Sequence, residues 1–145
     1  TLSTDLIVGF PGETEEEFEM TMETVRSLRF DLIYSFKYSS RPGTRAAEYP
    51  EHLTENEKSE RLRTLQETQE KIVQEKYEAL VGSIQEVLIE GKHHRKENTA
   101  TGRTRGNHPV SINNSATKAG DLLAVRITGA QPNSLEAEPI STSTD

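Results

Sequence analysis

The chain has 145 residues, of which 32% are hydrophobic and 28% charged, with no cysteine and a formal net charge of −7 at pH 7. These values exclude a large self-contained enzyme core, a disulfide framework, a thiolate nucleophile and any iron–sulfur cluster held by the chain's own thiolates. No apolar run approaches the roughly 18 residues of a membrane-spanning helix, so we expect a soluble cytoplasmic protein without a membrane partner.

The first predicted element is a short apolar strand at residues 5–8 that ends in the turn GFPGE. Because the strand is apolar and is bounded by Gly9, Pro11 and Gly12, we expect a parallel sheet that covers both of its faces. Active sites of α/β barrels lie at this end of a strand. The turn lacks the Lys-Ser/Thr of a P-loop and the glycine spacing of a dinucleotide fingerprint, so composition alone favours a structural turn over a phosphate cradle.

A helix is predicted to follow, because Thr14 and Glu17 have the spacing of a capping box. Acidic residues crowd its first turn, which complements the helix dipole. Its apolar stripe consists of Phe18, Met22, Val25 and Leu28. Residues 32–38 have strand propensity, so the first 38 residues are expected to form a right-handed strand–helix–strand unit.

A loop at residues 39–50 is expected to leave the second strand on the same side as the GFPGE turn. A second capping box, Thr54 with Glu57, opens a helix that is predicted to run to about Leu80, with Gly82 as its stop. The predicted apolar seam consists of Leu62, Leu65, Ile72, Val73, Tyr77 and Leu80. A charged helix of this length with one narrow seam is interpreted as a link between two domains.

After Gly82 the apolar period changes to that of strands. The predicted runs are residues 84–90, 100–105, 110–112, 122–127 and a fifth, short run at 135–137. Strands of this number and length hide their edges best in a small closed barrel. Residues 1–80 hold ten Lys and Arg against seventeen Asp and Glu, and residues 81–145 hold seven against seven, so the two parts differ in charge.

A basic cluster in the second part is the strongest functional signal from composition. It comprises Lys92, His93, His94, Arg95 and Lys96, followed by Arg103, Arg105, Asn107 and His108, and within it only Glu97 opposes the positive charge. A local positive field on a small barrel suits a phosphate backbone, although an ordinary lysine-rich hairpin loop is nearly as good an interpretation. The barrel offers no aromatic side chains for base stacking, so charge and shape would dominate RNA binding. The adjacent histidines lack further ligands and favour a solvated loop over a metal site.

Several segments, taken in order, resemble one family: TDLIVGFPGETEEEF, YSFKYSSRPGTRAA, ERLRTLQETQ, VLIEG, TGRTRGN and PNSL. They are similar to the carboxyl-terminal part of the radical S-adenosylmethionine (SAM) methylthiotransferases. FKYSSRPGT and TGRTRGN most resemble the MiaB branch, which adds a methylthio group to isopentenylated adenosine beside the tRNA anticodon. The resemblance spans almost the whole chain with compatible spacing.

The resemblance implies an α/β fold followed by an all-β fold. Residues 1–53 would be the end of a radical SAM partial (β/α) barrel, 54–80 a linking helix, 81–140 a five-stranded RNA-binding barrel called a TRAM domain, and 141–145 a polar tail. Intact members use SAM and two 4Fe-4S clusters held by cysteines, which this chain lacks. We therefore expect a truncated, monomeric chain that is inactive alone, with no catalytic or metal-binding residue of its own.

The family's binding sites can be carried over residue by residue. Ile7, Val8, Gly9 and, in the next strand, Phe36 would flank SAM. Arg41 would contact SAM, the sulfur donor or a nucleotide, with a loop salt bridge as an equally weighted alternative. The residues expected to contact tRNA phosphates are Lys92, Arg95, Lys96, Arg103 and Arg105, and Asn107 is expected in a turn that also hydrogen-bonds RNA.

Two alternatives stay open. One is a sister methylthiotransferase that acts on threonylcarbamoyl-adenosine in tRNA or on a ribosomal protein, although the RPGT loop favours tRNA over the ribosomal target. The other is a freestanding RNA-binding module in which the barrel remnant has no function.

Overall fold

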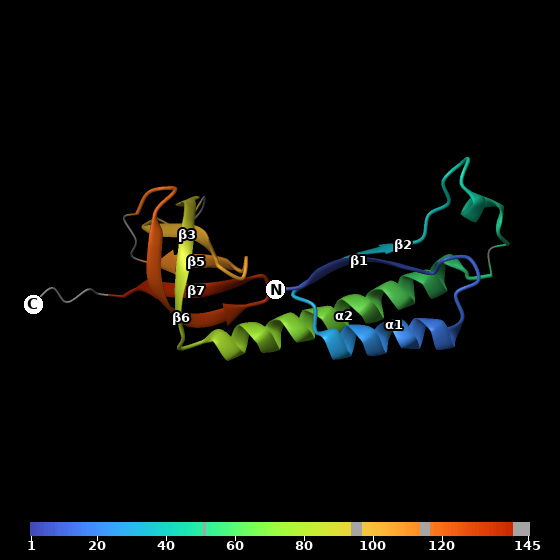
Figure 1. Ribbon diagram of the computed structural model, residues 1–145, viewed down its shortest axis with the longest axis horizontal. Helices are drawn as coiled ribbons and strands as arrows, with labels where there is room; N and C mark the ends of the chain where they lie inside the picture. Colours follow the sequence, from blue (N-terminus) through green and yellow to red (C-terminus); the bar gives the residue numbers. More distant parts are fainter. Residues whose placement is uncertain (51, 94–96, 114–116, 141–145) are drawn as a thin grey trace, which may run out of the picture. The chain divides into compact units, whose positions relative to one another are not determined.

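The structure, a computed structural model, describes residues 1–50, 52–93, 97–113 and 117–140. The chain divides into two compact units, Thr1–Val73 and Gln74–Asp145. Each unit is coloured along the sequence in Figure 1, in which the first runs from blue to green and the second from yellow-green to red. We describe them one after the other.

The first unit contains a parallel strand–helix–strand motif, as predicted. Strand β1 (Ser3–Val8) and strand β2 (Leu32–Lys37) are joined by helix α1 (Glu15–Leu28). The strands are parallel, and their register places Ile7 opposite Phe36. Both carboxyl ends therefore lie at the same edge of the two-stranded sheet, where the following loops begin.

The capping box at the start of α1 is confirmed. The Glu17 backbone N–H donates to the Thr14 hydroxyl at 3.2 Å, and the Thr14 N–H donates to the Glu17 carboxylate at 2.9 Å. The helix ends at Arg29, whose φ of 50° is left-handed. These local signals were readable in the sequence because a capping box depends only on residues three apart.

The core of the first unit lies between the sheet and the helices. Its buried residues are Val8, Phe18, Met22, Val25, Phe30, Ile33, Leu65 and Ile72. Leu28 was expected in the buried stripe but is 54% exposed. The expectation that β1 is covered on both faces is also wrong for this structure, because burial alternates along the strand and α1 and α2 cover one face only.

Helix α2 (Glu55–Leu80) confirms the predicted long helix, and a short 3-10 helix, η1 (Arg45–Glu48), precedes it. Its start is the predicted capping box: the Glu57 N–H donates to the Thr54 hydroxyl at 3.2 Å, and the Thr54 N–H donates to the Glu57 carboxylate at 2.7 Å. Leu65, Ile72 and Tyr77 of the predicted seam are buried. Two charged residues of the same helix, Lys58 and Arg61, are buried as well, which the sequence analysis did not anticipate.

The second unit is a closed five-stranded barrel. Its strands are β3 (Ile84–Lys92), β4 (Thr99–Thr104), β5 (Pro109–Asn113), β6 (Leu122–Gln131) and β7 (Ser134–Pro139). The order around the barrel is β3-β4-β5-β7-β6, closed by pairing between β6 and β3. All pairs are antiparallel except β5 with β7, which are parallel. All five predicted runs therefore form strands, and each differs from its predicted bounds by a few residues at most.

Inward-facing residues of every strand fill the barrel. The buried apolar residues are Val87, Ile89, Ala100, Val110, Ile112, Val125, Ile127, Leu135 and Ala137. Glycine is required where β4 crosses close to β3, because a Cβ at Gly102 would lie 2.6 Å from Cγ1 of Val87 and closer still to the carbonyl oxygen of Leu88. This tight crossing lies within the segment TGRTRGN, next to Arg103.

Candidate functional sites on the two units

The turn after β1 needs glycine for two reasons. Gly9 has a φ of +71°, which side-chain-bearing residues rarely adopt, and a Cβ there would lie 2.6 Å from Cγ of Lys58. The Gly9 N–H donates to Oε1 of Glu13 at 3.0 Å, which closes the turn on itself. Gly9 itself is buried, and the turn is packed against Lys58 of α2.

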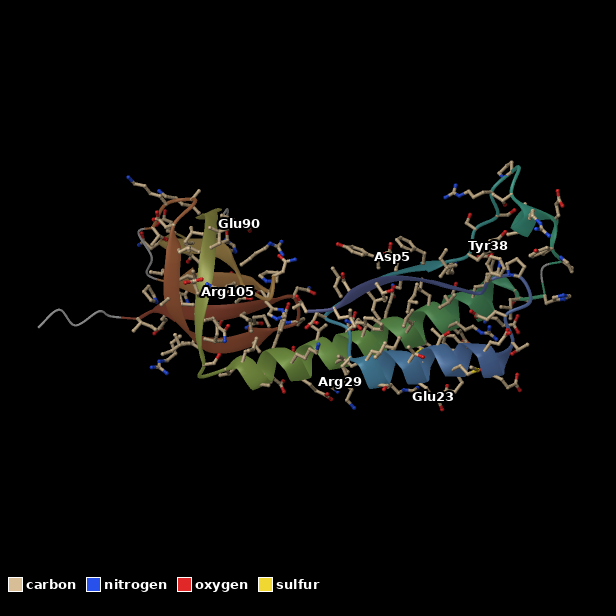
Figure 2. All side chains as sticks on the ribbon, viewed as in Figure 1. Asp5, Glu23, Arg29, Tyr38, Glu90 and Arg105 are labelled. Carbon is tan, nitrogen blue, oxygen red and sulfur yellow. The ribbon has the colours of Figure 1, made fainter. Side chains whose placement is uncertain are left out.

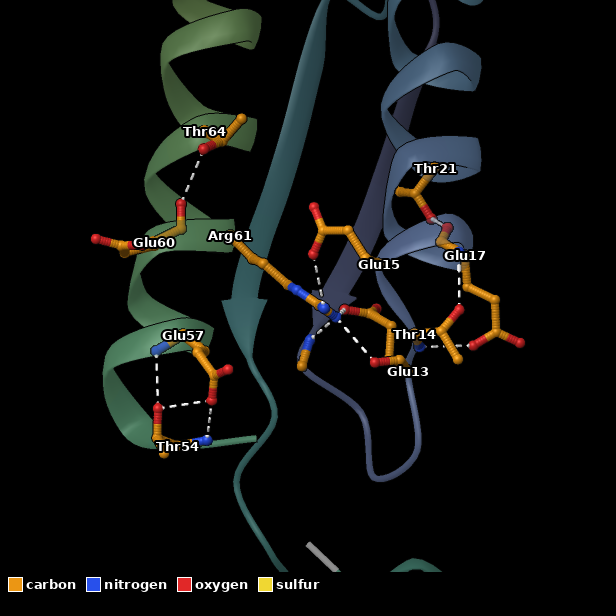
Figure 3. A network of polar contacts seen from close by, with 11 residues as sticks. Glu13, Thr14, Glu15, Glu17, Thr21, Thr54, Glu57, Glu60, Arg61 and Thr64 are labelled. Carbon is orange, nitrogen blue, oxygen red and sulfur yellow. Dashed lines mark hydrogen bonds and ion pairs between the residues drawn. The ribbon is translucent and has the colours of Figure 1, made fainter. Parts of the chain in front are cut away.

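Arg61 of α2 holds the far end of this turn, as Figure 3 shows. Its Nη1 donates to the backbone oxygen of Glu13 at 3.0 Å and to Oε1 of Glu13 at 2.5 Å, and its Nη2 donates to Oε2 of Glu15 at 3.0 Å. The Arg61 and Glu13 side chains are only 9% and 12% exposed. A buried guanidinium is tolerated because carboxylates and a carbonyl satisfy its donors.

Lys58 lies one helical turn earlier and is 1% exposed. Its Nζ pairs with Glu55 at 3.1 Å and lies 5.8 Å from the centre of the Tyr38 ring. Glu55 also accepts from Lys37 of β2 at 3.3 Å. The hydrogen bond from Lys58, and then that from Lys37, keep the pKa of Glu55 below its usual value. The aliphatic stem of Lys58 fills the space that the missing Cβ of Gly9 leaves.

The open face of the β1–β2 sheet brings two of the predicted SAM-binding residues together. Ile7 is 56% and Phe36 is 55% exposed, and they are register partners on the face turned away from the helices. Asp5, labelled in Figure 2, lies on the same face of β1. Val8, a third predicted residue, is instead fully buried in the core.

The two remaining predicted positions lie in the loops beyond the strands. Gly9 follows Val8 directly, and the Phe10 ring beside it packs edge-on against Tyr38 at 5.2 Å. Arg41 is exposed in the loop after β2, and its carbonyl oxygen accepts from the Thr44 hydroxyl at 2.8 Å. No ion pair joins the Arg41 guanidinium to another of the described residues, and its proposed roles stay predictions.

On the barrel, the predicted RNA-binding residues lie on β3, β4 and the β4–β5 turn. Lys92, Arg105 and Asn107 are exposed and Arg103 is half-buried. Arg95 and Lys96 lie outside the described residues. Asn107 has a φ of +63°, as its expected turn position requires, and its carbonyl and side-chain oxygens accept from Nη1 of Arg103 at 3.2 and 3.4 Å.

The structure also shows two acidic residues that the sequence analysis did not include in this surface. Glu90 accepts from Nε of Arg103 at 3.1 Å, and Glu86 accepts from Nε of Arg105 at 2.9 Å. Figure 2 labels Glu90 and Arg105 on the barrel. The alternating pattern of β3 in the sequence predicts that both glutamates lie on its outer face. Their contact with the arginines could not be read from the sequence, because it depends on how β3 pairs with β4.

Among the described residues, no group of three or more His, Cys, Asp or Glu side chains could hold a metal ion, and no helix is long and apolar enough to cross a membrane. Among the predicted loop histidines, His94 lies outside the described residues.

The chain was compared with known proteins. Residues 78–140 match the TRAM domain. The chain is 46% identical over 131 residues to a tRNA-2-methylthio-N(6)-dimethylallyladenosine synthase of Pelotomaculum thermopropionicum. The aligned residues make up 90% of this chain and 29% of the relative. Proteins of the same name from Haemophilus influenzae and Pseudoalteromonas translucida are 42% and 40% identical over 97% and 100% of this chain and 30% of their own lengths. The chain thus spans about a third of the curated relatives that it matches.

Proposed function

We propose that this chain, which carries a TRAM domain at residues 78–140 and matches about a third of the tRNA-2-methylthio-N(6)-dimethylallyladenosine synthases, is the carboxyl-terminal part of a radical SAM tRNA methylthiotransferase. Its target would be isopentenylated adenosine beside the anticodon. The observation that carries the proposal is the similarity of 40–46% identity, which runs through both units rather than through the TRAM domain alone.

The open sheet supports the assignment of residues 1–53 to a larger α/β barrel. The described residues of this range form a sheet of two parallel strands, and a two-stranded sheet with an exposed apolar face is marginal in water. Parallel strands normally have both faces covered. Further strands of a longer protein would extend the sheet and cover Ile7 and Phe36.

The residues at the carboxyl ends of β1 and β2 fit a SAM site. Ile7 and Phe36 offer an exposed apolar surface suited to an adenine, and Gly9 follows at the carboxyl end of β1. Arg41 is available for the carboxylate of SAM or for a phosphate. When bound with its iron–sulfur clusters, SAM would supply the radical and the methyl group. Because this chain has no cysteine, other parts of the protein would hold the clusters, and the chain alone would be inactive.

The barrel would bind tRNA through charge. Lys92, Arg103 and Arg105, with Arg95 and Lys96 of the basic cluster, can contact phosphates, and Asn107 can hydrogen-bond RNA from its turn. Closure of the barrel supports this role, because a closed barrel presents its surface residues on a fixed frame.

Salt-dependent binding of a tRNA transcript to the 145-residue chain tests the RNA-binding part. Each lost phosphate contact should reduce the slope of log affinity against log salt by about 0.7–0.9. Arg103→Gln with Arg105→Gln should weaken binding at low salt and flatten the slope. A control with the same charge change, Arg26→Gln with Arg63→Gln, alters exposed residues of the first unit and should change neither. Equal binding by the two double variants would defeat the assignment.

The nucleoside target is tested in cells. Deletion of the gene for the whole protein should abolish the methylthio group on isopentenylated adenosine, as measured by mass spectrometry of digested tRNA. Loss of the group from threonylcarbamoyl-adenosine instead would select the sister enzyme.

A freestanding RNA-binding module is the second candidate, and the self-contained core of the barrel favours it. It predicts that the chain binds tRNA while its gene encodes no cluster-binding cysteines. Sequencing the complete reading frame separates the two proposals.

A further inference from the structure

Two arginines on the barrel surface are each paired with a glutamate, an arrangement that the proposed function does not require. The side chains of Arg103 and Glu90 are 43% and 53% exposed, and those of Arg105 and Glu86 are 84% and 42% exposed. Pairs so exposed contribute at most about 1 kcal/mol to stability, so stability alone gives little reason for them. The pairs matter more for phosphate binding than for stability, because each carboxylate cancels the positive charge that would attract a phosphate.

The pairing of β3 with β4 brings these residues together. Arg103 lies opposite Leu88 on β3, and Glu86 and Glu90 lie two positions before and after Leu88 on the same outer face of the strand. Glu90 lies at the register shift between Ile89 and Gly91, and Arg105 directly follows β4.

The two arginines are held differently. Nε and Nη2 of Arg105 both lie 2.9 Å from a single oxygen, Oε1 of Glu86. Arg103 uses Nε for Glu90 and Nη1 for the oxygens of Asn107, and its Nη2 has no partner in the described part of the chain. If Glu90 were displaced, Asn107 would still orient Arg103, whereas Arg105 has Glu86 as its one ion-pair partner among the described residues.

Resting on the proposed RNA-binding function, we propose that Glu86 and Glu90 are specificity-determining residues that compete with RNA phosphates for Arg105 and Arg103. An RNA that offers only a phosphate backbone must displace a glutamate carboxylate from its arginine, and its phosphate then lies close to that negative charge. A tRNA that makes further contacts with the protein offsets this loss of binding free energy. The glutamates thus weaken binding of the wrong RNA more than binding of the right one, which is how an interface gains discrimination by repulsion.

The test compares two RNAs on the 145-residue chain: polyuridylate, which offers backbone and unstructured bases, and a tRNA transcript. Glu86→Gln should raise affinity for polyuridylate about fivefold at 50 mM salt and for tRNA about twofold, so that discrimination falls. Because Arg105 then gains a phosphate contact, the polyuridylate slope should steepen by about 0.7. Glu90→Gln should act in the same direction with a smaller gain, because Asn107 continues to hold Arg103.

Glu138→Gln is the matched control. It changes net charge equally on β7, a strand that pairs with neither β3 nor β4, and it should leave the ratio of the two affinities unchanged. Adding Arg105→Gln to Glu86→Gln should remove the gain. The proposal is overturned if Glu86→Gln and Glu138→Gln behave alike, or if both RNAs gain equally. If the unaltered chain binds no RNA at 50 mM salt, the proposed function itself fails; if it binds and the glutamate variants change nothing, only this inference fails.

Discussion

The two units treat charged residues in opposite ways. In the first unit Lys58 and Arg61 are buried against the turn after β1, and their charges are satisfied by carboxylates and carbonyl groups. In the barrel the interior is apolar apart from two threonines, and the ion pairs lie on the surface. Buried charge fixes geometry because a misplaced partner is costly, whereas surface charge can exchange partners.

This difference matches the roles proposed for the two units. A turn that approaches a small cofactor must hold its backbone in one place, and Arg61 binds two atoms of Glu13 in that turn and one of Glu15 at the start of α1. A surface that binds a polyanion needs arginines that can leave their first partner. The comparison can be tested by breaking one feature in each unit.

The largest effect is expected from Arg61→Ala. The substitution leaves the Glu13 carboxylate, 12% exposed, without its buried partner, and such a loss costs about 3–5 kcal/mol. Urea unfolding should measure the loss of stability, and hydrogen exchange of the β1 and β2 amides should locate it in the first unit. Arg63→Ala, an exposed site on the same helix, should change stability by less than about 0.5 kcal/mol. Equal effects of the two variants would show that the network is not structural.

Leu135→Ala should destabilise the barrel by about 2–5 kcal/mol, because the fully buried side chain leaves a cavity. The loss should appear in the exchange of β5, β6 and β7 amides, while amides of α1 keep their protection. Leu122→Ala removes the same atoms from a side chain that is 65% exposed, and it should have little effect. Loss of protection in α1 as well would mean that the units do not unfold separately.

A smaller loss, about 1–3 kcal/mol, is expected for Gly102→Ala. The new Cβ would collide with the backbone of Leu88, which cannot move without separating β3 from β4. Gly129→Ala is the control, because its Cβ would come no closer than 3.3 Å to any atom, and that atom is Oε2 at the flexible end of Glu136. Thermal unfolding should separate the two variants, and an unchanged midpoint for Gly102→Ala would contradict the close crossing.

The smallest effect concerns pH. The Thr54 N–H, and then the Thr54 hydroxyl, lower the pKa of Glu57 in the folded state. Its contribution to stability is therefore present above the usual glutamate pKa and is lost as pH falls below it toward the lowered folded value. When pH is lowered, the helical signal of α2 in circular dichroism should fall less in Glu57→Gln than in the original chain. Identical acid profiles for this variant and the original chain would exclude the effect.

Local patterns carried most of the fold prediction. The capping boxes at Thr14 and Thr54, the strand–helix–strand order and the five short strands all depend on neighbours in sequence, and all are present in the structure. Two expectations depended on tertiary environment and were wrong: coverage of both faces of β1 and burial of Leu28. The pairing of Glu86 and Glu90 with the arginines also depends on tertiary structure and was not predicted.

The missed residues show why the rest could not be predicted. Lys58 and Arg61 occupy positions that continue the buried stripe of α2 toward its start, since Leu65 and Ile72 follow at helical spacing. Charged residues are usually assigned to the solvent face, so the predicted buried stripe began only at Leu62 and omitted both residues. Only the carboxylates of Glu13 and Glu15, more than forty residues away in sequence, make their burial tolerable. The SAM and RNA site residues themselves stay predictions.

The order of strands around the barrel has a consequence for synthesis. Of the five barrel strands β7 comes last in the sequence, yet it lies between β5 and β6 and is parallel to β5. Until Ser134–Pro139 has left the ribosome, the nascent barrel has a gap with two exposed backbone edges. A stop codon about a dozen codons before residue 145 would therefore remove β7, the strand that closes the barrel. The product would be an open, aggregation-prone sheet.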